Sequence, residues 1–150
     1  MHLLLKTRVR PPVPTVWAGF NQSLFGKLSP PFPPVRVLRF DGCQPGDVVH
    51  LRLLFGLFHQ DWVSRIVDGQ TLGPADQPTE IYFVDEGTRL PFFLTYWHHR
   101  HRLLRHPSGG TLIVDDVTFR TPFRLTDYVL YPVLWLQFAY RKPIYRRVFC

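Results

Sequence analysis

The sequence is poor in cysteine, with only Cys43 and Cys150 among its 150 residues. These two residues form no C-x-x-C pair and have no spacing typical of a structural metal site. An amino-terminal export signal is also missing, because the apolar stretch at residues 2–5 is too short and ends at Lys6. We therefore expect two free thiols and a cytoplasmic protein.

Long hydrophobic runs and blocks of one charge are lacking as well. The most apolar segment, Tyr128–Tyr140, is shorter than the ~20 residues that cross a bilayer, so no transmembrane segment is expected. The net charge is +7, but the basic residues are scattered along the chain. No aromatic residues are interleaved with Arg100, Arg102, Arg120 and Arg124 to stack bases. A solvated basic surface without specific nucleic-acid binding is therefore predicted.

Motifs for nucleotide cofactors and nucleophilic catalysis are absent. No glycine cluster forms a phosphate-binding loop between a strand and a helix. None of the serines has the context of a nucleophile elbow. The chain also has a single Met and no glycine-rich fingerprint, so we expect no cofactor.

Apolar and aromatic residues are abundant, at 45% and 15% of the chain. This composition excludes a disordered chain. A length of 150 residues corresponds to one domain with a sizeable core. We therefore treat residues 1–150 as a single domain that is either monomeric or homodimeric.

Hydrophobic periodicity predicts one strand, then a helical segment, and then six further strands before the carboxyl-terminal segment. Residues Val13–Lys27 have apolar positions at three- and four-residue steps, interrupted by Gly19 and Asn21, which predicts two short helices. Asp85 and Glu86 lie beside Gly87 and are expected to be solvated acids of a turn. The predicted strands are Leu3–Val9, Val35–Phe40, Val48–Phe55, Gln60–Asp68, Glu80–Asp85, Phe92–Leu104 and Thr111–Thr121.

The carboxyl-terminal segment, from about Thr126 to Phe149, predicts one long helix. Thr126 is a suitable cap, and Asp127 places a negative charge in the first turn. The helix is apolar on nearly every side, so it is expected to be wrapped by a sheet. Pro132 is expected to kink it because proline removes a backbone hydrogen bond.

This order of elements, β-αα-β6-α, is similar to the helix-grip arrangement of the START and birch-pollen-allergen superfamily, also called SRPBCC. The resemblance is carried by FVDEGTRLPFFLTYWHHRHR (83–102), GGTLIVDDVTFRTP (109–122) and YPVLWLQFAYRKPIYRRVF (131–149), which resemble a bacterial branch of mostly unassigned role. It implies an α+β fold in which a curved antiparallel sheet of about seven strands wraps the carboxyl-terminal helix and leaves a cavity. Members include polyketide cyclases and dehydratases, lipid carriers, hormone receptors and chaperone cofactors, so the fold does not give the function.

Side-chain alternation assigns the faces of the last two strands. The arginines at positions 100, 102 and 120 are expected to face solvent. Asp116 is placed on that solvent face, opposite Arg100. The opposite, concave face then carries Trp97, His99, His101, Asp115, Val117 and Phe119.

His99, His101 and Asp115 are therefore the candidate catalytic residues. They can orient a ligand, act in acid–base catalysis, or satisfy one another around buried water. Asp115 is expected to lie opposite or diagonal to His101 and to raise its pKa. A metal site is not expected, because only Asp115 is available as a third ligand beside the two histidines.

The sequence favours binding of a hydrophobic or aromatic small molecule, or of a lipid, between sheet and helix. One alternative is a cyclase- or dehydratase-like enzyme that uses the histidines and Asp115. Another is a peripheral membrane or partner-binding protein that uses the basic end of the long helix. The predicted ligand-binding residues are Trp97, His99, His101, Asp115, Val117, Phe119, Phe83, Tyr131 and Trp135.

Overall fold

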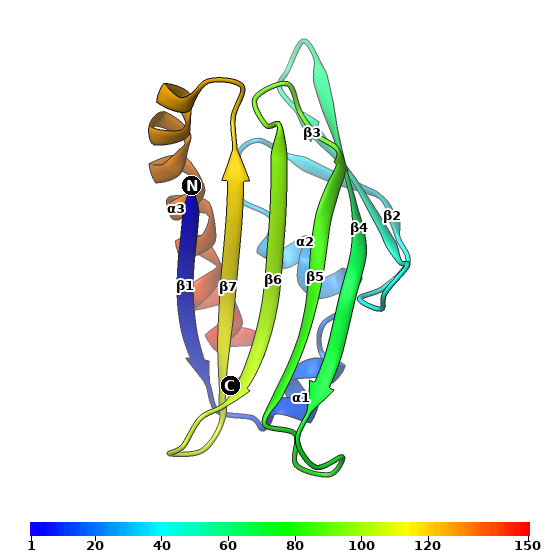
Figure 1. Cartoon of the computed structure of the whole chain (residues 1–150), viewed down its shortest axis with the longest axis vertical. Helices are drawn as coiled ribbons and strands as arrows, with labels where there is room; N and C mark the ends of the chain where they lie inside the picture. Colours follow the sequence, from blue (N-terminus) through cyan, green and yellow to red (C-terminus); the bar gives the residue numbers. More distant parts are fainter.

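Seven strands pair into one antiparallel sheet in the computed structural model, which describes residues 1–150 (Figure 1). The order along the sheet is β1-β7-β6-β5-β4-β3-β2, so only β1 pairs with a strand distant in the sequence. The strands are β1 (His2–Val9), β2 (Val35–Phe40), β3 (Val48–Leu54), β4 (His59–Leu72), β5 (Glu80–Arg89), β6 (Tyr96–Arg105) and β7 (Thr111–Arg120). The predicted α+β fold and element order are confirmed.

The two short helices are α1 (Val13–Ala18) and α2 (Gln22–Leu28). Asn21 separates them because its side chain accepts a 3.0 Å hydrogen bond from the Leu24 amide and so caps α2. Both helices lie on the same side of the sheet as the long carboxyl-terminal helix (Figure 1). The prediction of two short helices within Val13–Lys27 is therefore confirmed.

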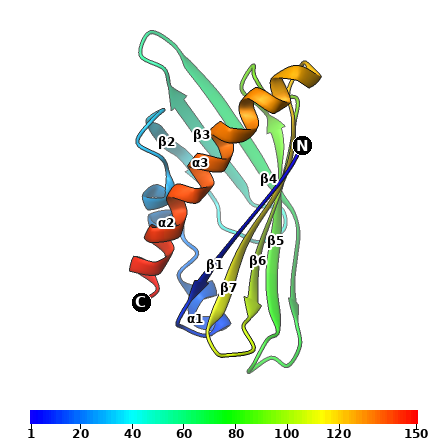
Figure 2. The ribbon, with the colours of Figure 1, turned by 90° about the vertical axis from the view of Figure 1, so that its left-hand side faces the viewer.

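The long helix α3 (Arg124–Val148) begins earlier than predicted. Thr126 is not its cap, because the Thr126 hydroxyl donates to the Phe123 carbonyl at 2.7 Å from inside the first turn. The helix continues through Pro132 and Pro143, and Figure 2 shows its amino-terminal turns inclined to the remainder. No helix of the protein combines the length and the apolarity needed to cross a bilayer.

The sheet covers only one face of α3, which lies diagonally across it (Figure 2). Leu134, Phe138 and Tyr145 are buried against the sheet. The predicted grip of the sheet on the helix is confirmed, although the opposite face of α3 remains in solvent. The large apolar side chains exposed on that outer face include Leu125, Tyr128, Val129, Leu136 and Tyr140.

Strand β5 is longer than predicted, and this changes the surroundings of Asp85. The expected turn at Glu86 and Gly87 is wrong, because β5 continues to Arg89 and pairs with both of its neighbours. Strand β4 likewise continues beyond its predicted end at Asp68, through Gly69 to Leu72. The pairing of β4 with β5 shifts register between Val63 and Ser64 and between Ile66 and Asp68, which marks bulges, and bulges bend a sheet.

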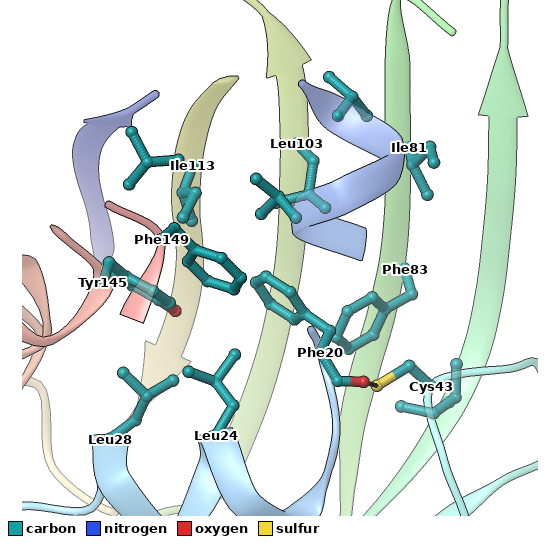
Figure 3. Close-up of a cluster of buried hydrophobic side chains, with 14 residues drawn as sticks. Phe20, Leu24, Leu28, Cys43, Ile81, Phe83, Leu103, Ile113, Tyr145 and Phe149 are labelled. Carbon is teal, nitrogen blue, oxygen red and sulfur yellow. Dashed lines mark hydrogen bonds between the residues drawn. The ribbon is translucent and has the colours of Figure 1, made fainter. Parts of the chain in front are cut away.

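The core consists of two clusters of buried side chains, one at each end of the molecule. The first joins α1, α2 and the end of α3 to the sheet, and Figure 3 shows Phe20 at its centre. The Phe20 ring stacks on Tyr145 and on Phe149, with ring centroids 6.3 Å away in both cases. The second cluster packs Leu134 and other α3 residues on β1, β6 and β7. Each large apolar side chain buried in this way contributes roughly 1.5–3 kcal/mol to folding.

Candidate functional site

A cavity of about 360 Å³ lies between the curved sheet and α3. It is lined by 28 residues, 18 of them hydrophobic, from α2, strands β2 to β6 and α3. The volume falls in the range of small-molecule sites and equals roughly a dozen water molecules. The cavity therefore has the size and the apolar lining of a ligand-binding pocket.

A buried polar cluster forms one part of the cavity wall. Asp85 of β5, His99 and His101 of β6 and Asp115 of β7 point to the same side, and Arg141 of α3 meets them from above the sheet. In the strand registers Asp85 is directly opposite His99, and His101 is directly opposite Asp115. The predicted register of β6 and β7 is confirmed by the second of these pairs.

The hydrogen bonds of the cluster run diagonally across the strands. His101 Nε2 donates to Asp85 Oδ2 at 2.7 Å, and His99 Nε2 donates to Asp115 Oδ1 at 3.0 Å. A second donor to Asp85 is the indole Nε1 of Trp97, which is 3.1 Å from Oδ1. Each carboxylate therefore holds one imidazole, and an ionised carboxylate can only accept, so both histidines carry a proton on Nε2.

The two remaining imidazole nitrogens have no hydrogen bond. His99 Nδ1 lies 3.6 Å from Asp85 Oδ2, which is beyond hydrogen-bonding distance. His101 Nδ1 is buried without any partner. The two rings are packed closely, with centroids 3.5 Å apart, and His101 also stacks on Phe83.

Burial dominates the electrostatics of His101. Burial, followed by the repulsion of His99, lowers the pKa of His101 to about 4, although the Asp85 hydrogen bond acts in the opposite direction. The expectation that a carboxylate raises the pKa of His101 is wrong, because desolvation of the imidazolium outweighs the attraction. The pairing is also corrected, since the hydrogen-bond partner of His101 is Asp85 and that of His99 is Asp115.

Both aspartates of the cluster are held ionised. Burial alone raises the pKa of Asp85, but the His101 hydrogen bond and the charges of both histidines lower it below its ordinary value. For Asp115, burial is similarly outweighed by the His99 hydrogen bond and by the charge of Arg141, so its pKa is lowered. The Arg141 guanidinium lies 3.6 Å from Asp115 Oδ1.

The predicted site residues are divided between the cavity and the core. Phe83, Trp97, His99 and His101 line the cavity. Asp115 lies behind His99, to which it is hydrogen-bonded.

The other predicted ligand-binding residues do not line the cavity. Val117 and Phe119 are fully buried in the second core cluster. Tyr131 packs beside that same cluster, and Trp135 lies on the exposed side of α3. The helix instead presents its residues at four-residue steps, among them Leu130, Leu134 and Phe138.

Sequence reasoning missed Asp85 and Arg141. Asp85 shares its strand face with Phe83, so extending β5 by alternation places it in the cavity. Arg141 was assigned to the basic end of the helix, yet it follows Phe138 by three residues on the same helix face. Its guanidinium lies over the Phe138 ring, 4.3 Å from the centroid.

A seven-stranded antiparallel sheet that holds a long helix over a cavity is the Bet v 1-like helix-grip fold of SRPBCC proteins. No protein-family model and no curated protein sequence matches the chain. Its likeness to known proteins therefore comes from solved structures with the same fold.

Protein Ms6760 from Mycobacterium smegmatis has a TM-score of 0.67 at 17% sequence identity, covering 99% of this chain and 90% of that one. The Zhui aromatase/cyclase from Streptomyces sp. R1128 has a TM-score of 0.58 at 15% identity, covering 97% and 93%. Ara h 8.0201 has a TM-score of 0.56 at 15% identity, covering 97% of both chains. At these identities the comparisons establish the shared fold.

Proposed function

We propose that the protein binds a hydrophobic or aromatic small molecule, or a lipid, in the cavity between the sheet and α3. The observation that carries this proposal is the apolar cavity with a single buried polar cluster in its wall. Such a site holds the ligand by its apolar surface and orients it by one or two hydrogen bonds. The protein would then serve as a carrier or a sensor.

Aromatic walls favour a flat or ring-containing ligand. Trp62 and Trp97 both line the cavity and meet edge to face, with centroids 4.7 Å apart. Phe138 stacks on Trp97 from the helix side at 6.2 Å. A ligand ring placed against these surfaces would bring a hydroxyl group, which can donate to an unprotonated Nδ1, within reach of the histidines.

A matched pair of substitutions on α3 tests this proposal. Leu134 lines the cavity, whereas Leu136 lies two positions further along on the exposed face. Leu134→Trp should fill the cavity and weaken binding of the fluorescent probe anilinonaphthalene sulfonate at least tenfold. Leu136→Trp should bind the probe like the wild type. Equal binding by the two variants, with both correctly folded, would refute a cavity site.

A second candidate function is acid–base catalysis of the kind carried out by cyclases and dehydratases. It is favoured by the 2.7 Å hydrogen bond between Asp85 and His101, which resembles a catalytic base held by an orienting carboxylate. The shared fold with an aromatase/cyclase is in accord with it. Turnover of a poly-β-ketone or cyclic ketone should then fall by two orders of magnitude or more in Asp85→Asn, with Asp116→Asn on the convex face as the control.

A third candidate is docking on an anionic membrane surface through the outer face of α3. Leu125, Val129 and Leu136 are exposed there, and Arg146 and Arg147 continue the same face at the end of the helix. A helix with exposed apolar and basic residues suits a negatively charged lipid interface. Co-sedimentation with phosphatidylserine vesicles should be salt-sensitive and should be lost in Leu136→Asp. Equal binding to neutral phosphatidylcholine vesicles would contradict it.

A further inference from the structure

The polar cluster has the donor set of a metal site. One ligand atom from each of Asp85, His99 and His101 lies within 4.8 Å of the other two. Asp85 Oδ2 is 2.7 Å from His101 Nε2 and 3.6 Å from His99 Nδ1. Ligand atoms bound to one transition-metal ion lie roughly 3 Å apart, because each bond is ~2 Å long. The two distances lie on either side of that value, so small side-chain movements suffice.

We infer that Asp85, His99 and His101 bind a divalent transition-metal ion whose open coordination positions face the cavity. Two imidazoles and one carboxylate suit zinc, iron(II) and cobalt(II) better than magnesium or calcium, which prefer oxygen ligands. Three protein ligands leave at least one position free. All three residues line the cavity, so that position would meet an oxygen of the bound molecule. This last role rests on the proposed function, whereas metal binding does not.

Asp115 fixes the tautomer of His99 that can bind a metal ion through Nδ1. Its carboxylate holds the proton of His99 on Nε2, and the Nδ1 lone pair therefore faces Asp85 without a donor between them. A carboxylate behind a metal-binding histidine is the usual outer-shell arrangement, because it orients the ring and increases its basicity. His101 needs only to move its proton from Nε2 to Nδ1, which has no partner, to free Nε2 for the ion.

The charges of the cluster also favour a cation. The carboxylates of buried Asp115 and half-buried Asp85 are opposed by a single guanidinium, and Arg141 lies beside Asp115 rather than Asp85. Asp85 forms ion-pair contacts only with the two histidines. A half-buried carboxylate without a fixed positive partner is costly, and a divalent ion between the imidazoles would compensate its charge.

Metal titration of untagged protein, stripped with a chelator, tests the inference. Calorimetry with Zn²⁺ and visible absorption with Co²⁺ should both report one equivalent per chain. Asp85→Asn and His101→Gln should weaken binding at least tenfold. The control is His98→Gln, on the opposite face of the same strand, which should bind like the wild type.

The outer-shell role of Asp115 is tested by a neighbouring pair of variants. Asp115→Asn should weaken Co²⁺ binding by about 10- to 100-fold, the usual effect of losing such a partner. Asp116→Asn, whose side chain lies on the other face of β7, should change nothing. Absence of a Co²⁺ spectrum in the wild type would overturn the inference, as would binding that depends on His98. Probe binding to the metal-free cavity is measured separately, so the two proposals can fail independently.

Discussion

His99 and His101 occupy similar positions on one strand, yet each is held by a different carboxylate. His99 is hydrogen-bonded to Asp115, and His101 to Asp85. Because both bonds involve Nε2, we expect long-range ¹⁵N correlations of the metal-free protein to show both imidazoles with the proton on Nε2. Asp115→Asn should disturb the signals of His99, and Asp85→Asn those of His101. The reverse pattern would show that the diagonal pairing is wrong.

The two cysteines should differ strongly in reactivity. Cys43 is buried, and burial raises the pKa of its thiol to about 12, whereas Cys150 is exposed. At neutral pH only Cys150 should therefore react rapidly with a chromogenic thiol reagent, giving one fast equivalent in the folded protein. Two equivalents should react after denaturation without a reductant. Equal rates for both thiols in the native state would contradict the buried position of Cys43.

Asp61 should make stability depend on acid pH. Its carboxylate accepts hydrogen bonds from Arg52 at 2.8 and 3.2 Å, and these hold the pKa of Asp61 well below its ordinary value. The resulting stabilisation is complete above the unfolded pKa of ~3.9 and declines as the pH falls below it. Urea unfolding should therefore show Asp61→Asn less stable than wild type at pH 6, with the difference shrinking below pH 4. A difference independent of pH would contradict the ion pair.

At the residue scale, alternation along a strand predicts faces well but not where the strand ends. Trp97, His99 and His101 were placed on the concave side because the arginines between them require solvent. Asp85 was not predicted to face the cavity, because an acid pair beside a glycine is typical of turns. In the structure Gly87 remains in the strand, and an added Cβ there would lie 2.3 Å from the Leu90 side chain. A glycine is needed at position 87 because the Leu90 side chain packs against it. This contact cannot be recognised from the local sequence pattern.

At the scale of elements, α3 combines two faces with different roles. Leu134 is 3% exposed against the sheet, and Leu136 is 63% exposed on the outer face. Leu134→Ala should lower the free energy of unfolding by about 2–5 kcal/mol, because it enlarges a buried space. Leu136→Ala should change it by less than about 0.5 kcal/mol. Urea denaturation measures both, and equal losses would mean that the outer face is covered in solution.

The exposure of the outer face of α3 is the feature of this helix that the sequence pattern does not predict. A helix apolar on nearly every side indicates burial on every side when the chain is the only protein considered. The sheet, however, reaches one face only, and no other element covers the opposite one (Figure 2). Composition alone does not distinguish a helix enclosed by its own chain from one that keeps a face for a membrane or a partner.

At the scale of the whole molecule, the order of elements determined the fold, while the cavity arises from how the elements are spaced. Two packed clusters, one at each end of the molecule, join α3 to the sheet. Bulges in the pairing of β4 with β5 bend the sheet. None of these features is encoded in a short motif, so the sequence predicts cavity residues on the strands, such as Phe83, Trp97 and His101, better than those on α3.

The most direct test of the central claim is native mass spectrometry of the protein as purified. If the cavity between the sheet and α3 binds a small molecule, the wild type and Leu136→Trp should carry the same additional mass. Leu134→Trp should lack that mass, because its indole occupies the cavity. A wild type that stays at the mass of the bare chain even after incubation with hydrophobic ring compounds would contradict the account. An added mass that persists in folded Leu134→Trp would place the ligand elsewhere.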